Sequence, residues 1–278
     1  MPIPNILADS PYRPKNRCGL LVSVRNAQEA QLCLRCGVDV LDLKEPLAGA
    51  LGTVPDTVIE QVRQSVMEVT PQRRPKLSFA VGELAEWDFQ RFSRLLDRYS
   101  ADQIAGFSYV KIGLAGATEL ADWRLAWTEL FAGLPDSIRP VVVGYLDRQP
   151  DQVGDLAATE ASSRGAPCPA IEQLIEFAQS QPQVSTILLD TFGKQSDLFA
   201  SVDDRRLGQI IASAGQAGLA TVVAGSVGVD SLPRVLQAGA SLVGVRGAVC
   251  EGDRSGQLCE KKLIDFARSL TSDPQDSI

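Results

Sequence analysis

Two oppositely charged residues, Asp42 and Lys44, stand at the end of an apolar run of the sequence, residues 38–43. They are two positions apart, so on a pleated strand both side chains point to the same side of the sheet. Pro46, which has no amide hydrogen to donate, stops the strand shortly after them. Burying an acid and an amine together costs free energy unless they have a partner or a function. The pair is therefore compatible with catalysis and equally with an ion pair on the rim of a sheet.

Three charged residues repeat this placement downstream. Lys111 lies inside the apolar run 108–112, Asp190 directly follows the run 186–189, and Lys194 comes four residues later. Apolar neighbours desolvate an amine and make it available as a nucleophile or base. The alternatives are lysines that extend their ammonium groups to the rim and an aspartate that caps a turn. The predicted catalytic residues are Asp42, Lys44, Lys111, Asp190 and Lys194.

Small residues and an arginine follow the last two apolar runs, in the segments AGSVG (224–228) and GVRGAVC (244–250). Glycines leave backbone amides open to an anion, and an arginine holds a phosphate with two parallel hydrogen bonds. Tight turns alone would explain the glycines but not the arginine. The predicted phosphate-binding residues are Ser23, Arg25, Gly225, Ser226, Arg246 and Gly247.

Alternating strand and helix patterns would bring these residues together. Apolar strand-like runs occur at residues 20–24, 38–43, 76–80, 108–112, 141–146, 186–189, 220–223 and 242–245. Amphipathic helical patterns occur at 27–36, 56–69, 89–99, 119–131, 171–181, 204–217, 231–238 and 261–270. Near-continuous apolar strands linked by helices indicate a parallel sheet covered on its faces. Eight such units predict an α/β fold with a single (β/α)8 TIM barrel, in which the carboxyl ends of the strands carry the active site.

Two segments interrupt the pattern. Residues 1–18 are rich in proline and are predicted to be a disordered or loosely packed extension of a barrel that covers 19–278. Residues 149–169 form a polar insertion after the fifth strand. At that place the insertion is either a lid over the site or a solvated loop.

Composition limits the chemistry. The chain has no histidine, which excludes Ser-His-Asp hydrolysis and histidine-based metal catalysis, and no residue is predicted to bind a metal. Six cysteines without zinc-finger spacing, including Cys33 and Cys36, are expected to be reduced core thiols. A net charge of −7 argues against a nucleic-acid or membrane partner. Without a signal peptide, the expected location is the cytoplasm.

Five motifs, DLKEPLAGALG, YVKIGL, LLDTFGK, AGSVG and GVRGAVCEGDR, together resemble the (5-formylfuran-3-yl)methyl phosphate synthase family. The resemblance covers nearly everything after residue 18. It implies a TIM-barrel lyase that condenses two glyceraldehyde 3-phosphate molecules, releases phosphate and water, and serves methanofuran-type cofactor biosynthesis. It further implies that Lys44 forms a Schiff base with the triose, that Lys111, Asp190 and Lys194 occupy the other catalytic positions, and that Asp42 accompanies Lys44.

Two other functions stay open at this point. One is a different Schiff-base aldolase or sugar-phosphate isomerase of the same fold, which would give a product without a furan. The other is a non-catalytic barrel that binds a phosphorylated metabolite. No cofactor is expected, and the expected partners are a triose phosphate and further copies of the chain in a homo-oligomer.

Overall fold

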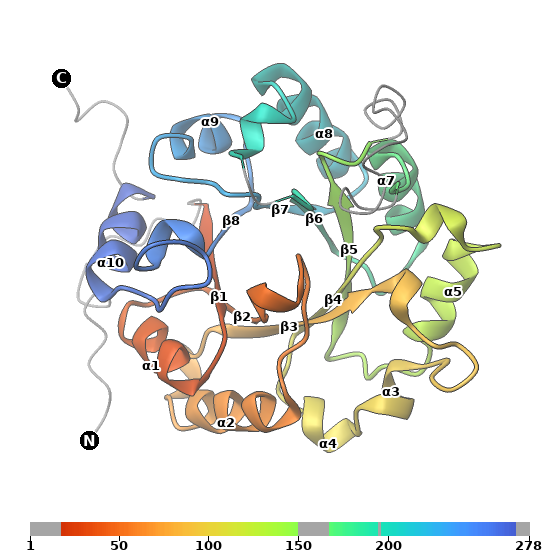
Figure 1. The fold of residues 1–278 in the computed structure, drawn as a ribbon, viewed down its shortest axis with the longest axis horizontal. Helices are drawn as coiled ribbons and strands as arrows, with labels where there is room; N and C mark the ends of the chain where they lie inside the picture. Colours follow the sequence, from red (N-terminus) through yellow and green to blue (C-terminus); the bar gives the residue numbers. More distant parts are fainter. Residues whose placement is uncertain (1–17, 150–166, 194–195, 271–278) are drawn as a thin grey trace.

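A computed structural model describes residues 18–149, 167–193 and 196–270 of the chain. Its eight strands are all parallel and close into a barrel in which each strand pairs with its neighbours in sequence and β8 pairs with β1 (Figure 1). The predicted TIM barrel is confirmed. The strands are β1 Gly19–Val24, β2 Val40–Leu43, β3 Lys76–Glu83, β4 Tyr109–Gly113, β5 Arg139–Tyr145, β6 Thr186–Asp190, β7 Ala220–Val223 and β8 Leu242–Val245.

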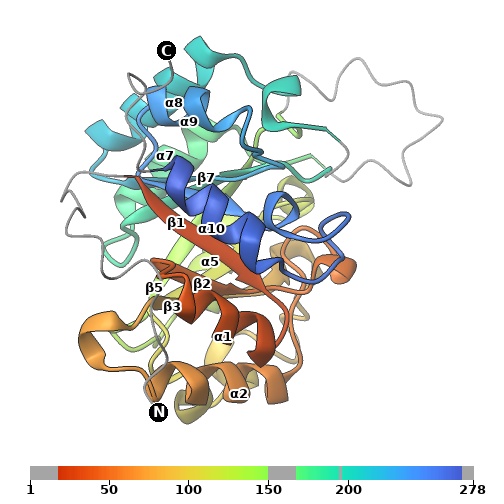
Figure 2. The same ribbon diagram turned by 90° about the vertical axis from the view of Figure 1, so that its left-hand side faces the viewer.

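Helices surround the barrel and bury its outer face. They are α1 Ala27–Arg35, α2 Asp56–Met67, α3 Leu95–Arg98, α4 Ala101–Ile104, α5 Trp123–Leu130, α7 Ile171–Ser180, α8 Asp204–Gln216, α9 Leu232–Gln237 and α10 Glu260–Ser269. Figures 1 and 2 both show α1 and α10 against the outside of β1, and Arg35 of α1 pairs with Glu260 of α10. Short 3₁₀ turns lie in several loops, among them η1 Pro46–Ala48, η3 Leu84–Glu86 and η7 Gly247–Val249.

Two separate apolar layers follow from the alternation of side chains along each strand. The larger layer fills the space between sheet and helices and includes Val22, Leu41 and Val110. The smaller layer fills the barrel interior and includes Val143 and Leu188. Every second residue of a strand thus points into the barrel. At the carboxyl ends of the strands the apolar interior residues give way to polar ones.

The helix predicted at 89–99 is wrong in its extent. The segment holds only the short helix α3 near its end, and a second short helix, α4, follows. Local polar bonds divide the chain here: Asp97 accepts from the backbone N–H of Arg94, and the Ser100 hydroxyl accepts from that of Gln103. Side chains that satisfy backbone donors in this way start a new helix instead of extending the old one.

The third strand is longer than predicted and ends in a bulge. It continues past Ala80 to Glu83, and its register with β4 shifts between these two residues. Gly82 has a φ of +85°, a backbone conformation that other residues rarely adopt. The shift carries Glu83 to the carboxyl end of the barrel, where its side chain is buried.

Candidate active site

A cavity of about 320 Å³ opens among the carboxyl ends of the strands. It is lined from β1, β2, β4 and β6 and by the loops after β7 and β8. Its volume lies at the lower end of the usual range for small-molecule sites. The residues on its wall that carry polar chemistry include Ser23, Asp42, Lys44, Lys111, Asp190 and Arg254.

Asp42 and Lys111 form an ion pair inside the barrel. Their side chains are 1% and 4% exposed, and the Lys111 Nζ contacts Asp42 Oδ1. The Ser23 hydroxyl donates to Asp42 Oδ2 over 3.2 Å. Ser23 and Asp42 are register partners on β1 and β2, which is why both side chains point inward. Two opposite charges held close together in the barrel interior compensate each other, and a role of this pair in proton transfer stays a prediction.

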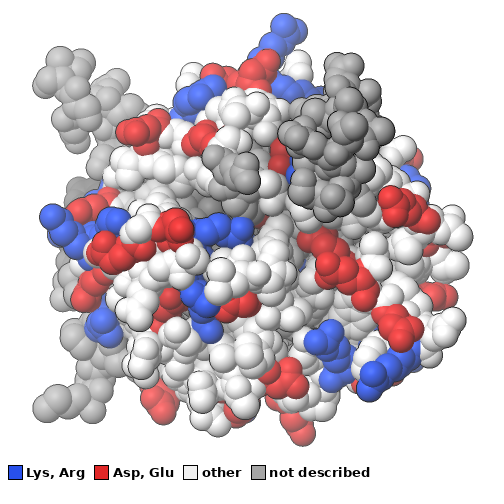
Figure 3. Space-filling model, in the orientation of Figure 1, with Lys and Arg blue, Asp and Glu red and all other residues white. Residues whose placement is uncertain are grey.

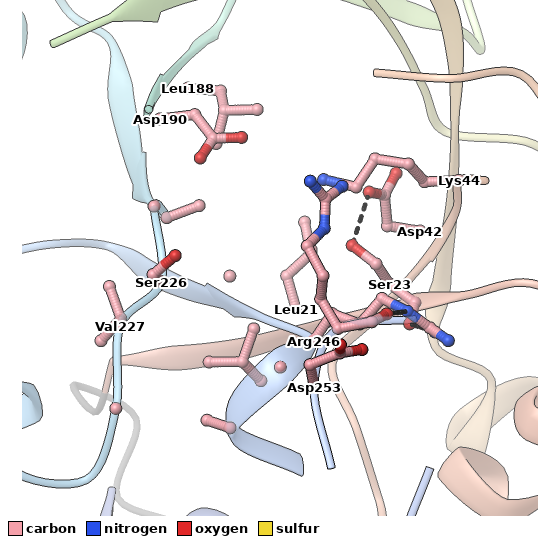
Figure 4. Close-up of a pocket in the computed structure, with 18 of the residues that line it drawn as sticks. Leu21, Ser23, Asp42, Lys44, Leu188, Asp190, Ser226, Val227, Arg246 and Asp253 are labelled. Atoms are coloured by element: carbon pink, nitrogen blue, oxygen red, sulfur yellow. Dashed lines mark hydrogen bonds between the residues drawn. The ribbon is translucent and has the colours of Figure 1, made fainter. Parts of the chain in front are cut away.

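Lys44 follows β2 and reaches into the same cavity. Its backbone N–H donates to the Val24 carbonyl, which continues the ladder by one residue, and the residue as a whole is 8% exposed. Figure 4 shows its side chain extending from the wall that carries Asp42 into the cavity, with Asp190 and Ser226 on the opposite wall. The amine therefore meets the cavity and not bulk water.

Asp190 closes the opposite wall at the end of β6. It is 1% exposed, and its Oδ1 accepts from the backbone N–H of the next residue, Thr191, over 2.8 Å. Its register partner on β5 is Tyr145, so the two side chains share the inward face. Lys194, the remaining predicted catalytic residue, lies outside the described residues.

The loops after β7 and β8 have the backbone expected of an anion site. Gly225 has a φ of +105°, and Ser226 has a φ of +57°, a left-handed conformation uncommon outside glycine. Gly247 begins the short turn η7 on the neighbouring loop. All three residues line the cavity. Unusual backbone at a cavity is typical of functional loops, and phosphate binding by these residues stays a prediction.

The two arginines predicted to bind phosphate are placed differently. Arg25 pairs with Glu45 and donates to the Ser255 carbonyl, and it is absent from the described cavity wall. Arg246 borders the cavity, but its five N–H groups already donate. They go to both Glu29 oxygens and to the carbonyls of Ser23, Arg254 and Gly256. The Arg246 guanidinium is thus fully engaged within the protein, and phosphate binding by Arg25 and Arg246 stays a prediction.

Arg254 is a cavity residue that the sequence analysis missed. It is half-buried, and one of its Nη atoms donates to the Gly49 carbonyl, which links the β8 loop to the β2 loop. Burial lowers the pKa of Arg254, while the charges of Asp190 and Glu45 act in the opposite direction. The only sequence cue was a second arginine shortly after Arg246, and nothing in the spacing distinguished the two.

Glu83 and Tyr145 form a second missed group. Glu83 is 7% exposed, Tyr145 is fully buried, and the phenol donates to the carboxylate over 2.6 Å. Burial raises the pKa of Glu83 to about 7, and the Tyr145 hydrogen bond opposes the rise. The sequence offered one cue to this group. Gly113, the register partner of Glu83 on β4, is a glycine inside a strand, which often marks the close approach of another group.

The cysteines that the structure describes are free thiols. Burial raises the pKa of Cys36 to about 11 and that of Cys33 above its usual range, so both resist ionisation. Over residues 18–149, 167–193 and 196–270, no three His, Cys, Asp or Glu side chains gather as a metal site. Among the described helices, none has the length and apolar character to cross a bilayer.

The face seen in Figure 3 carries Lys and Arg side chains intermingled with Asp and Glu. No large area of one sign dominates what is visible there. A nucleic-acid backbone favours a face dominated by basic residues. The predicted lack of a nucleic-acid partner is compatible with this distribution and stays a prediction.

Known structures share the fold. A phosphoribosyl anthranilate isomerase from Thermus thermophilus superposes with a TM-score of 0.52 at 13% identity, covering 91% of this chain and 98% of that one. A thiamine phosphate pyrophosphorylase from Pyrococcus furiosus also gives 0.52 at 13% identity, with 92% and 96% covered. At such identities the likeness concerns the barrel alone.

Sequence comparison goes further. A (5-formylfuran-3-yl)methyl phosphate synthase of Methanopyrus kandleri is 30% identical over 249 residues, 88% of this chain and 95% of the relative. Its counterpart in Methanosarcina acetivorans is 28% identical, over 84% of this chain and 92% of the relative. The family model described as 4-HFC-P synthase matches residues 20–267. The match includes residues of all eight strands and the whole cavity lining, so the chain is an enzyme that belongs to the 4-HFC-P synthase family.

Proposed function

We propose that this enzyme makes (5-formylfuran-3-yl)methyl phosphate from two molecules of glyceraldehyde 3-phosphate, with release of phosphate and water. The product would serve a cofactor of the methanofuran type. The names of the relatives support the product. The observation that carries the proposal is the position of Lys44, buried in one cavity with an internal ion pair and two glycine-bearing loops.

Lys44 would act as the nucleophile. Its amine attacks the carbonyl carbon of a triose phosphate, water leaves, and a Schiff base remains. The iminium withdraws electrons from the neighbouring carbon, so a proton there can be removed and a carbon–carbon bond can form.

Asp42 and Lys111 would carry protons on the same wall, because they lie beneath Lys44 on the inward faces of β2 and β4. Asp190 would do so on the opposite wall. The conversion of two trioses into an aromatic ring requires several proton transfers, which accounts for several acids and amines in one site. The loops at Gly225 and Gly247, together with Arg254, would hold the phosphate groups.

The test is incubation of the purified enzyme with glyceraldehyde 3-phosphate while ultraviolet absorbance and free phosphate are recorded. Borohydride is then added, and the modified peptide is identified by mass spectrometry. We expect a furan chromophore, equivalent phosphate release and a triose adduct on Lys44. Another aldolase or isomerase of this fold would give no furan.

Lys44→Ala is expected to abolish both the adduct and the furan. The matched control is Lys76→Ala, a strand lysine at the opposite end of the barrel, whose Nζ donates to the Tyr109 hydroxyl. It should retain activity. A fully active Lys44→Ala enzyme would remove the Schiff-base mechanism.

A further inference from the structure

The Glu83 carboxylate occupies space that is open because residue 113 is a glycine and has no side chain. Its carboxylate lies where the Cβ of residue 113 would be, and Gly113 leaves that place open. Gly113 comes two residues after Lys111 on β4, so this place is the next inward-facing position of the same strand. The bulge in β3 brings the carboxylate there. Glu83 thus stands one position beyond Lys111 at the barrel mouth.

Two donors fix the carboxylate. The Tyr145 hydroxyl donates to Oε1 over 2.6 Å, and the backbone N–H of Ala115 donates to Oε2 over 3.0 Å. Tyr145 is held in turn by an edge-to-face contact with Phe192, 5.4 Å between ring centroids, and by Gln149, which donates to its carbonyl. Such support keeps a functional group in one geometry.

The acid neighbours two groups already assigned to the site, although Glu83 itself is not among the residues that line the described cavity. Lys111 precedes Gly113 on β4, and Asp190 is the register partner of Tyr145. The titratable groups that act on Glu83 are Tyr145 from β5, Glu86 from η3 and Asp190 from β6. Cys168, before α7, is also within electrostatic reach. Burial raises the pKa of Glu83 to about 7, and both Glu86 and Asp190 raise it further. Near pH 7 the group therefore exists in both protonation states, as an acid–base catalyst requires.

We propose that Glu83 is a catalytic acid of this enzyme, that it protonates a hydroxyl group which leaves the substrate as water, and that Tyr145 is its positioning residue. This inference rests on the proposed furan synthesis. In the step, the nitrogen lone pair of a Lys44 enamine forms the iminium double bond, and the enamine π electrons form a new carbon–carbon double bond. The carbon–oxygen bond breaks with its electron pair going to oxygen. Glu83 gives that oxygen its proton, so water and a carboxylate result.

In this proposal, two sides of the barrel mouth carry out different steps of the reaction. The Asp42 and Lys111 side holds charges that compensate each other, which suits formation and rearrangement of the Schiff base. Glu83 supplies a neutral acid on the adjoining side, which suits departure of a hydroxyl group. Dehydration needs such an acid because hydroxide is a poor leaving group.

The test combines Glu83→Gln with measurement of two separate steps. In wild type, kcat for furan formation is expected to fall as pH rises through about 7, because the acid form is lost. Glu83→Gln should still give the borohydride adduct on Lys44, but its rate of furan formation should fall at least 100-fold. The descending limb of the pH–rate profile near pH 7 should disappear in this variant. Glu86→Gln, at an exposed neighbouring acid, is the matched control. It should keep both activity and limb, with the limb moved slightly to lower pH.

Tyr145→Phe provides an independent measurement. The phenol hydrogen bond lowers the pKa of Glu83, so its removal should shift the limb to higher pH, which a merely structural loss would not do. The inference alone would be overturned if Glu83→Gln formed the furan at the wild-type rate and kept the limb of the pH–rate profile near pH 7. It would also be overturned if that limb did not move in Tyr145→Phe. Absence of any furan from the wild-type enzyme would overturn the proposed function and the inference with it.

Discussion

Two ion pairs of this chain, Arg246–Glu29 and Lys111–Asp42, are similar in burial but differ in their surroundings. Their side chains are 5% and 7% exposed in the first pair, and 4% and 1% in the second. The first joins β8 to α1, and all five N–H groups of its arginine are engaged. Both pairs have a residue on the cavity wall, Arg246 in the first and Lys111 with Asp42 in the second. Burial and position therefore do not distinguish the two pairs, whereas the hydrogen-bonding capacity left to the Lys111 ammonium does.

The largest effect expected from this comparison is on activity. Lys111→Met combined with Asp42→Asn removes both charges, so no buried charge is left uncompensated and the free energy of unfolding should stay near that of wild type. Furan formation should nevertheless fall by roughly 10²–10⁴-fold, the usual contribution of acid–base groups. Urea unfolding and steady-state rates measure the two quantities. If the double variant is both stable and active, the Lys111–Asp42 pair has no catalytic role and resembles the Arg246–Glu29 pair.

Arg246→Met should show the opposite profile. It leaves Glu29 buried without its cation, which costs about 3–5 kcal/mol of unfolding free energy. The activity per folded molecule should change little, because all five N–H groups of the guanidinium are engaged within the protein. Arg35→Met on α1, the helix that carries Glu29, is the control, since its half-exposed pair with Glu260 contributes less than about 1 kcal/mol. A selective loss of kcat in folded Arg246→Met would contradict the distinction.

Glu83 extends the comparison to a buried acid whose hydrogen bonds come from a phenol and a backbone amide. Its pKa is raised from 4.5 to about 7, so the folded state retains a proton that the unfolded chain releases between these values. The free energy of unfolding should therefore fall as pH rises from 4.5 to 7, by up to about 3.5 kcal/mol at about 1.4 kcal/mol for each pH unit. Glu83→Gln should remove this part of the dependence, as measured by urea unfolding at pH 5 and pH 8. Equal slopes in the two proteins would contradict the raised pKa.

Arg254→Gln tests whether the arginine that lines the cavity binds a phosphate group of the substrate. We expect KM for the triose phosphate to rise about 10-fold, equivalent to about 1.4 kcal/mol of lost binding, with a smaller change in kcat. Arg124→Gln on the outer helix α5 is the matched control and should behave as wild type. An unchanged KM in Arg254→Gln would leave phosphate binding to the glycine loops.

Much of the fold could be predicted because it depends on local pattern. The bounds of β7 and β8 agree with the apolar runs at 220–223 and 242–245, since buried parallel strands are continuous apolar segments. The convergence of Asp42, Lys44, Lys111 and Asp190 on one cavity follows from the same logic, because all strand ends of a parallel barrel meet at one face.

The remaining features depend on contacts between distant parts of the chain. Arg246 is occupied because Glu29, 217 positions earlier, lies beside it in space, and no local pattern reveals which arginine meets that acid. Glu83 follows the predicted third strand but was not predicted to be a site residue, because its contact with Gly113 of the neighbouring strand cannot be seen in the sequence. The bulge that redirects the chain is a property of the pairing with β4 and not of the segment itself.

The proposed chemistry at the barrel mouth depends on the space that Gly113 leaves for the Glu83 carboxylate. The methyl group of Gly113→Ala would displace the Glu83 carboxylate directly, so this small substitution should impair the proposed acid without changing the type of any reacting residue. Positions 83 and 113 should consequently vary together among relatives, and a redesign of substrate choice has to treat them as one unit.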